Sequence, residues 1–246
     1  MKIDLNCDMG ESFGRYKLGN DAAVMAYISS ANIACGLHGG DPIVMRTTIQ
    51  LARQHGVAIG AHPGWPDLQG FGRREMNLTS EEVEAFVLYQ IGALAAFAKA
   101  EDIELRHVKP HGALYNQAAK DRALATSIAQ AVQHFDSDLI LVGLAGSALI
   151  AAGLELGLRV ANEGFPDRRY NPDGTLVSRK EANAILESAE EVAAQAVALA
   201  REGIDFAGRR VQVDTMCLHG DNLHAAENAR MVHDALAKEG IEVKAL

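Results

Sequence analysis

The chain alternates between short apolar runs and longer segments with helical periodicity, and this alternation most restricts what it can fold into. Runs with the length and composition of buried strands lie at residues 3–8, 31–35, 57–62, 105–110, 139–142, 158–163 and 211–219. Segments with apolar residues every three or four positions separate most of these runs. One of these segments follows a capping box at 79–82, and another is an alanine-rich helix expected over 182–201. Asp221 or Asn222 is placed to cap the last helix, and 241–244 is expected to add a short terminal strand. About seven strand and helix units predict a mostly parallel sheet covered by helices, either closed as a barrel or open and doubly wound.

The stretch 31–42 is predicted to be a buried strand that runs into a glycine-rich turn and a helix start. Small and β-branched residues suit a parallel strand, and the glycines allow a sharp reversal of the backbone. Asp41 is placed to cap a helix that begins at Pro42, and Gly56 is placed to end it. His38 is thereby predicted at the carboxyl end of a strand, where α/β proteins usually carry out chemistry.

Polar residues recur at this one place in the pattern, the carboxyl end of a predicted strand. The residues at these positions are Asp8, His38, His62, His111, Glu163 and His219. A closed barrel gathers such ends around one mouth, whereas an open sheet spreads them along an edge. The phosphate-binding patterns G-x-G-x-x-G and G-x-x-x-x-G-K-[ST] are also missing from the chain. We therefore predict one β/α barrel domain over residues 1–246, with a shared active site at its mouth.

Two chemistries are open for this mouth. Asp8, His38 and His62 are ligand types for a hydrolytic divalent metal, although their spacing is not a metal signature. The same residues could act without a metal, with a carboxylate or an imidazole activating water and with hydrogen-bond donors holding an oxyanion.

A second informative stretch, 108–116, contains Lys109 and His111 around a proline, followed by Tyr115 and Asn116. Such a set suits a carboxylate or phosphate on a small substrate, with a solvated strand-end lysine as the alternative. The loop 164–179 adds Arg168, Arg169 and Arg179, which are either an anion clamp or surface charge. The loop 63–74 is long and aromatic, which suggests a lid or a binding loop. The loops 63–74 and 164–179 are both candidates for a docking or lid surface.

Composition narrows the partners and the compartment. With a formal charge of −9 over 246 residues and no basic cluster, a nucleic-acid surface or an anionic membrane is an unsuitable partner. We find neither a signal peptide nor a stretch of consecutive apolar residues long enough to span a bilayer, so we expect a cytoplasmic protein. Cys7, Cys35 and Cys217 lie in apolar runs and are predicted to be buried, reduced thiols.

Six motifs resemble those of the LamB/YcsF family, in that family's order and over essentially the whole chain. They read LNCDMGE (5–11), NIACGLHGGDP (32–42), GAHPG (60–64), VKPHGALYN (108–116), EGFPDR (163–168) and LHGD (218–221). The resemblance implies an irregular, TIM-like seven-stranded β/α barrel, similar to the barrels of glycoside hydrolases and carbohydrate deacetylases.

The resemblance also implies an activity, the ATP-dependent opening of the lactam of 5-oxo-L-proline to L-glutamate. The chain would be the catalytic component of a complex with companion B and C subunits that hydrolyses ATP to ADP and phosphate. Because the chain has no nucleotide motif, we expect ATP binding mainly in the other subunits. A bound divalent metal and a homo-oligomer are left open.

Carried over by motif, the active-site positions are Asp8, His38, His62, Lys109, His111 and Glu163. We predict catalytic roles for Asp8, His38, His62, His111 and Glu163, and substrate binding by Asn6, Lys109, Asn116 and Arg168. If a metal is bound, Asp8, His38 and His62 are its expected ligands.

Two rival functions belong to other classes. The first is a metal-dependent deacetylase of an N-acetylated sugar, which would need stacking aromatics, and few are available beyond Trp65, Phe71, Phe165 and Tyr170. The second is a non-catalytic protein that binds and hands on a small ligand within the complex. It predicts that replacing His38 or His62 leaves the turnover of the assembled enzyme intact.

Overall fold

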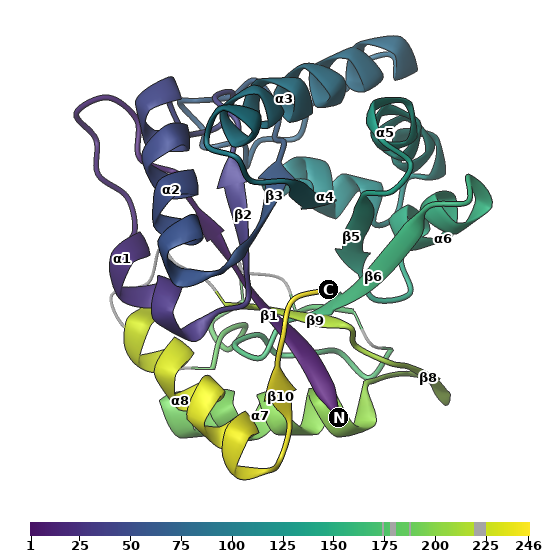
Figure 1. Ribbon diagram of the computed structural model, residues 1–246. Helices are drawn as coiled ribbons and strands as arrows, with labels where there is room; N and C mark the ends of the chain where they lie inside the picture. The colour runs from purple at the N-terminus through teal and green to yellow at the C-terminus, as the bar shows by residue number, and fades with distance from the viewer. Residues whose placement is uncertain (174, 178–180, 187, 219–224) are drawn as a thin grey trace.

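The computed structural model describes residues 1–246 except 174, 178–180, 187 and 219–224, and its centre is a closed parallel barrel (Figure 1). The seven barrel strands, in their order around it, are β1 (Lys2–Met9), β2 (Ser30–Ala34), β3 (Ala58–His62), β4 (Leu105–Val108), β5 (Ile140–Leu144), β6 (Arg159–Gly164) and β9 (Thr215–Leu218). Strand β9 pairs with both β6 and β1, which closes the barrel. The closed barrel is thus confirmed over the open sheet.

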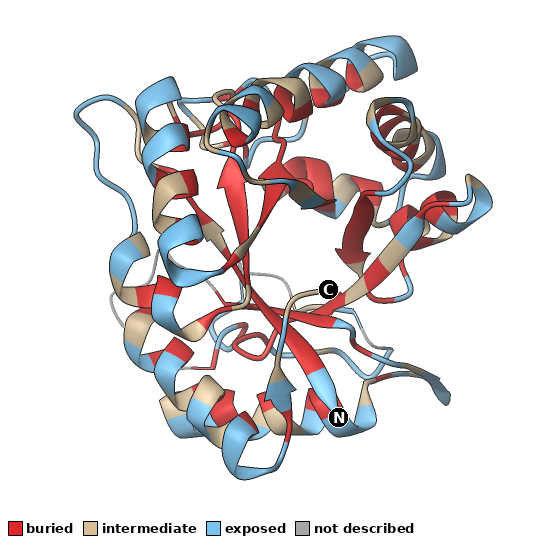
Figure 2. Cartoon of the chain, viewed as in Figure 1, coloured by how far each residue is buried: buried red, intermediate tan, exposed pale blue. Residues whose placement is uncertain are grey.

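Helices cover the outside of the barrel and turn their buried faces toward the strands (Figure 2). They are α1 (Asp21–Val24), α2 (Pro42–His55), α3 (Ser80–Ala100), α4 (Gly112–Ala118), α5 (Arg122–Phe135), α6 (Ala148–Glu155), α7 (Ala189–Glu202) and α8 (Ala225–Lys238), with a short 3-10 helix at Met25–Tyr27. The main apolar core lies between these helices and the strands. Two smaller buried clusters are separate from it, one of Ile140, Val142 and Ala161 and one of Tyr115, Phe165 and Cys217.

The local helix signals in the sequence are confirmed. The Asp41 carboxylate accepts from the N–H groups of Ile43 and Val44, at 2.8 and 3.0 Å, and α2 ends at Gly56 with φ of 68°. Helix α3 begins with a reciprocal capping box between Thr79 and Glu82. Backbone N–H and C=O groups at helix ends have no partner within the helix, and these capping residues supply one. The residue types that do so mark the helix boundaries in the sequence.

The region after β6 differs most from the prediction. The helix expected from residue 182 begins at Ala189, where the Ser188 hydroxyl accepts from the N–H of Glu191. The strand expected over 211–219 is shorter, and an antiparallel hairpin of β7 (Ile204–Phe206) and β8 (Arg209–Val211) precedes it. The short terminal strand is confirmed as β10 (Glu242–Val243), parallel to the start of β1.

Helix α3 is long and apolar enough to cross a membrane by length and composition alone. It has no run of consecutive apolar residues long enough to span a bilayer, so the sequence did not predict a span here. In the structure the helix packs against α5 and β3, with Val83, Val87, Ile91 and Leu94 buried. This one-sided burial is that of a core helix of the barrel.

Candidate active site

Strand β1 lines one wall of the interior with polar side chains. Successive side chains of a strand point to opposite faces, so Asp4, Asn6 and Asp8 share one face while Leu5 and Cys7 belong to the apolar core on the other. Asp4 and Asn6 are buried, and Asp8 lies one layer closer to the mouth. The strand therefore places Asp8 at the carboxyl end of the barrel, with Asn6 and Asp4 deeper in the interior on the same face.

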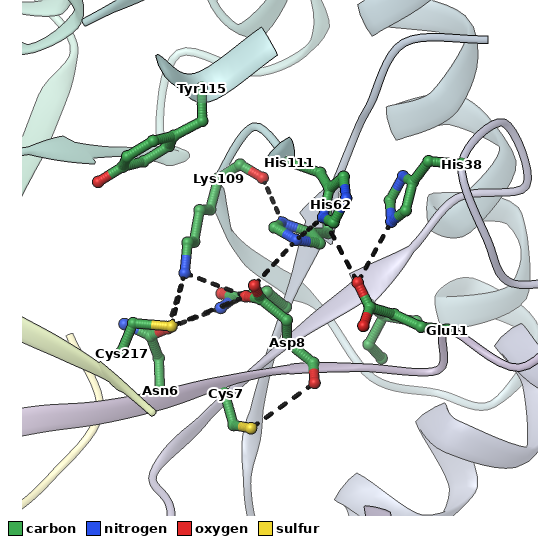
Figure 3. Close-up of polar contacts among 12 residues, drawn as sticks. Asn6, Cys7, Asp8, Glu11, His38, His62, Lys109, His111, Tyr115 and Cys217 are labelled. Atoms are coloured by element: carbon green, nitrogen blue, oxygen red, sulfur yellow. Dashed lines mark hydrogen bonds and ion pairs between the residues drawn. The ribbon is translucent and has the colours of Figure 1, made fainter. Parts of the chain in front are cut away.

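Five other predicted catalytic or binding residues surround Asp8. His62 ends β3, Glu163 lies in β6, His38 follows β2, and Lys109 and His111 follow β4. The ammonium of Lys109 is 3.0 Å from Asp8 Oδ1, and His62 Nε2 is 3.3 Å from Asp8 Oδ2 (Figure 3). The same ammonium is 2.8 Å from Glu163 Oε1. Closing the barrel thus brings six sequence-predicted residues into one cluster.

The Lys109 ammonium lies among acceptors. Besides the two carboxylates it contacts the Asn6 Oδ1 atom at 3.3 Å and the Cys217 sulfur at 3.0 Å. Burial alone would lower the pKa of Lys109, but the charges of Asp8 and Glu163 outweigh it and raise that pKa well above its usual value. Lys109 is therefore a fixed cation at neutral pH.

Asp8 is held in its ionised form by its neighbours. Burial raises the pKa of Asp8, but its interactions with His62 and with the Lys109 ammonium reverse that effect and hold the pKa well below its usual range. Its side chain is 20% exposed, more than those of Glu11, Lys109 or the histidines it contacts. Asp8 is therefore the anion that a molecule entering the mouth meets.

A buried hydrogen-bond network supports this pair from below. Glu163 accepts from the Asn6 amide at 2.9 Å and from the Tyr115 hydroxyl at 2.7 Å. The Asn32 amide in turn donates to Asn6 at 2.7 Å and to Asp8 at 2.9 Å. With both oxygens of Glu163 engaged, the carboxylate is fixed in one position beside Lys109.

Three imidazoles and a carboxylate form a second cluster on the other side of Asp8. The rings of His38 and His111 are stacked, with centroids 3.7 Å apart, and His111 Nδ1 is 3.0 Å from His62 Nε2. Glu11 Oε1 lies 3.5 Å from His38 Nε2 and 3.4 Å from His111 Nδ1. One ligand atom from each of the four residues lies within 4.8 Å of the other three, so this group could hold a metal.

The composition of this second cluster differs from the ligand set expected from the sequence. Asp8 is outside the four-residue group, and Glu11 and His111 take part in it with His38 and His62. Burial lowers the pKa of His111 to about 3 and that of His38 well below its usual value. These two rings are therefore neutral at pH 7, the form in which imidazole binds metals.

Glycines explain how Glu11 reaches His38. A Cβ atom on Gly39 would lie 2.9 Å from the backbone oxygen of Glu11, and one on Gly40 would lie 2.7 Å from that of Gly10. Gly40 also has φ of 77°, in the left-handed region that favours glycine. The glycine-rich turn after β2 therefore packs directly on the turn after β1, which places the two side chains together.

Two residues predicted to bind substrate lie elsewhere. Asn116 is exposed on α4, one residue beyond the buried Tyr115. Arg168 is buried and donates to the carbonyls of Val177 and Ala184, so it holds the loop after β6 together. His219, Arg179 and the last helix cap expected at Asp221 or Asn222 lie outside the described residues.

The loop 63–74 closes one side of the mouth. Phe71 packs edge-on against His38 and His111, with ring centroids 5.8 and 5.1 Å apart. Trp65, in contrast, is buried, and its indole N–H donates to Gln117. The loop thus covers the histidines with one aromatic ring and anchors itself with the other.

Several residues of the site were not predicted from the sequence as site residues. They are Glu11, Asn32, His107 and Cys217. The position of Cys217 follows from strand alternation, because it shares a face with Thr215, whose hydroxyl accepts from the Asn6 amide. Glu11 belongs to the motif 5–11 but follows the end of β1, so only the packing of the two turns places it. The three cysteines are buried and free, as predicted.

Comparison with known proteins identifies relatives over the whole chain. A curated relative from Pyrococcus furiosus, named as the A subunit of 5-oxoprolinase, is 53% identical over 247 residues, which cover 99% of this chain and 97% of the relative. One of the same name from Geobacillus kaustophilus is 55% identical over 250 residues, which cover 99% and 96%.

A solved structure agrees with this result. The crystal structure of a lactam utilization protein from Thermus thermophilus matches all of this chain with all of its own, at 48% identity and a TM-score of 0.94. The model of the LamB/YcsF family matches residues 3–246. The chain therefore belongs to the LamB/YcsF family.

Proposed function

We propose that this chain is a cytoplasmic component of a 5-oxoprolinase and carries the site where the lactam of 5-oxo-L-proline is opened to L-glutamate. The observation that carries the proposal is full-length similarity, above 50% identity, to relatives named as the A subunit of 5-oxoprolinase. The site supports it independently, because ionised Asp8 lies at the mouth of the barrel beside a buried cation and three imidazoles.

The chemistry of the reaction explains why such a site is needed. Opening the lactam breaks its C–N bond, adds a water oxygen to the carbonyl carbon and leaves a proton on the nitrogen. Asp8 is the general base in this proposal, since it is ionised and is the most exposed acid of the cluster. Lys109 and Glu163 keep Asp8 charged and in place, which is a positioning role.

Resonance makes a lactam resistant to water, so ATP is proposed to activate its carbonyl oxygen by phosphorylation. Transfer of the phosphoryl group to this oxygen leaves ADP. A water molecule then adds to the activated carbon, and the C–N bond breaks as the nitrogen takes up a proton. A second water hydrolyses the resulting acyl phosphate to the carboxylate and releases phosphate. The sequence contains no Walker-type loop, so we assign the ATP site mainly to the partner B and C subunits. The loop 63–74, which covers the histidines through Phe71, is the proposed docking or lid surface.

The sugar deacetylase is the weaker alternative on structural grounds. A sugar site needs aromatic rings presented at an open surface, but Trp65 and Phe165 are buried and the Tyr170 hydroxyl accepts from the backbone of Phe165. Of the four aromatics considered, Phe71 lies against the histidines at the mouth. We therefore favour the lactam as substrate.

Reconstitution tests the proposal. The purified chain is mixed with its B and C partners, ATP and 5-oxo-L-proline, and glutamate and phosphate are followed together. We expect turnover with all three subunits and little or none with this chain alone. Asp8→Asn is expected to lower turnover about 10²-fold or more, whereas Asp234→Asn, on the exposed face of α8, keeps it.

Two results would count against the proposal. If no glutamate forms with all three folded subunits present, the assignment as a 5-oxoprolinase is wrong. If Asp8→Asn, His38→Asn and His62→Asn complexes all turn over at the wild-type rate, the chain only binds a ligand and the catalytic site lies in a partner.

A further inference from the structure

The tautomers of two histidines are fixed by backbone carbonyls. His62 Nδ1 is 2.7 Å from the carbonyl oxygen of Lys109, and His111 Nε2 is 2.9 Å from that of Phe71. A carbonyl oxygen can only accept a hydrogen bond, so each of these nitrogens carries a proton. In the neutral rings, His62 Nε2 and His111 Nδ1 are therefore both acceptors, and they face each other at 3.0 Å.

The other atoms around this point are acceptors as well. Glu11 Oε1 is 3.4 Å from His111 Nδ1, and Asp8 Oδ2 is 3.3 Å from His62 Nε2. His38 is fully buried, and neither of its ring nitrogens has a hydrogen-bond partner among the described residues. Lone pairs that converge at such distances repel each other unless a cation lies between them.

Three of the six separations among the ligand atoms of Glu11, His38, His62 and His111 are close to those around a small metal ion, and all six are within 4.8 Å. Bonds of about 2.0–2.1 Å to a tetrahedral zinc ion place neighbouring ligand atoms about 3.3–3.4 Å apart. The observed separations are 3.5 Å for His38 with Glu11, 3.4 Å for His111 with Glu11 and 3.0 Å for His111 with His62. Three imidazoles and a carboxylate are also a donor set that divalent transition metals prefer.

We infer that Glu11, His38, His62 and His111 form a binding site for one divalent transition-metal ion of the zinc class. Binding of the ion is independent of the proposed lactam hydrolysis, and only its use in that reaction rests on the proposed function. An ion at this point would lie beside Asp8, where it could polarise a carbonyl oxygen or a water molecule.

The surroundings hold the four side chains in place for such a role. Metal-binding histidines usually donate their second N–H to a carbonyl or carboxylate, as His62 and His111 do here. A Cβ atom on Gly64 would lie 2.5 Å from His38 Nδ1, so the absence of a side chain at Gly64 makes room for that ring. Phe71 shields the stacked pair of His38 and His111.

The test measures metal binding by the isolated full-length chain, without ATP, partners or 5-oxoproline. After chelator treatment and dialysis, zinc chloride is titrated by calorimetry, and cobalt chloride is followed by visible absorption. We expect one equivalent of zinc to bind, and one equivalent of cobalt to give the intense visible bands of a four-coordinate site. This measurement does not depend on lactam turnover. The metal site and the proposed function can therefore be refuted independently of each other.

Variants identify the ligands. Glu11→Gln and His38→Asn are expected to weaken zinc binding at least tenfold, and His134→Asn, at an exposed ion pair with Glu84, is the matched control. Asp8→Asn is expected to weaken it less than Glu11→Gln, because Asp8 is a neighbour and not a ligand. Circular dichroism confirms that each variant is folded.

Three results would overturn the assignment. The first is that the wild-type chain binds none of zinc, cobalt, manganese and ferrous iron, in which case a proton on His62 separates the facing nitrogens. The second is a cobalt spectrum of the weak octahedral type in the wild-type chain. This measurement needs no variant, so it tests the four-residue site even if the variants do not fold. The third is unchanged zinc affinity in folded Glu11→Gln and His38→Asn.

Discussion

Replacing Lys109 with methionine removes the cation that lies between Asp8 and Glu163. Both carboxylates contact its ammonium within 3.0 Å, and the Glu163 side chain has no solvent exposure. Methionine has a similar length and no charge, so the substitution leaves the packing nearly intact and the carboxylates uncompensated. We expect the Lys109→Met chain to be markedly less stable at pH 7.

The magnitude follows from the partners that remain. Breaking a buried ion pair by deleting one partner typically costs about 3–5 kcal/mol. Glu163 keeps its hydrogen bonds from Asn6 and Tyr115, and Asp8 keeps His62 and some contact with water. The loss should therefore lie near the lower end, about 3 kcal/mol. With a urea m-value of about 3 kcal/mol/M, the unfolding midpoint would fall by roughly 1 M.

A double-mutant cycle isolates the charge effect. Glu163→Gln alone is expected to destabilise the chain, because it unbalances Lys109 and changes the bond from Tyr115. In the Lys109→Met background the same change removes a buried, unpaired charge, so it should restore about 1–2 kcal/mol. Lys99→Met, at an exposed position near the end of α3, is the control for loss of a lysine and should change stability by less than about 0.5 kcal/mol.

Urea unfolding followed by circular dichroism measures all five chains. The reasoning is refuted if Lys109→Met shifts the midpoint no more than Lys99→Met does. It is also refuted if the effects of Lys109→Met and Glu163→Gln simply add, because then the two side chains do not compensate each other's charge.

Further predictions concern other described residues. Burial lowers the pKa of His107 to about 3, so below pH 6.5 this histidine binds a proton in the unfolded chain but not in the folded chain. The free energy of unfolding should therefore fall as pH drops from 6.5 toward 3, by at most about 1.4 kcal/mol per pH unit. Urea unfolding of His107→Gln should show a weaker dependence of this free energy on pH. Gly64→Ala places a methyl group against His38 and should lower zinc affinity at least tenfold in calorimetry, whereas Gly92→Ala, in an open position on α3, should raise the free energy of unfolding by about 0.5–1 kcal/mol. Tyr115→Phe should destabilise the chain by about 1–3 kcal/mol in urea, because Glu163 loses a buried donor.

Those parts of the fold that depend on local chemistry could be predicted from the sequence. The strand and helix alternation, the Asp41 cap and the Thr79 capping box each follow from neighbouring residues. The position of the start of α7 could not be read in this way, since the alanine-rich pattern continues on both sides of Ala189 and the Ser188 cap decides the boundary. The β7–β8 hairpin was missed for a related reason, because its strands have three residues each.

The site was predictable where a residue lies directly on a barrel strand and less so beyond it. Asp8, His62 and Glu163 belong to strands, so the topology alone brings them to one end. Asn116, predicted to bind substrate, lies on α4, which begins at Gly112. One further residue along a helix turns a side chain by about 100°, so Tyr115 is buried and Asn116 is exposed. The helical register was needed to separate the two.

The charges at the mouth connect the metal site to the proposed substrate. Counting Asp8, Glu11 and Glu163 as anions, Lys109 and Arg73 as cations and the imidazoles as neutral, the formal charge of the mouth is about −1. Arg73 belongs to this count because it lies over the Phe71 ring, at 5.1 Å, and its charge helps to lower the pKa values of His38 and His111.

The proposed substrate, 5-oxoproline, is itself an anion at pH 7, so a mouth of charge about −1 would repel it. A divalent ion among the imidazoles would change the formal charge of the mouth from about −1 to about +1. Metal binding and substrate binding should therefore be coupled, since each favours the charge state that the other requires. The ion would then serve recognition of the substrate as well as the hydrolytic step, while Lys109, already held by Asp8 and Glu163, remains a positioning residue.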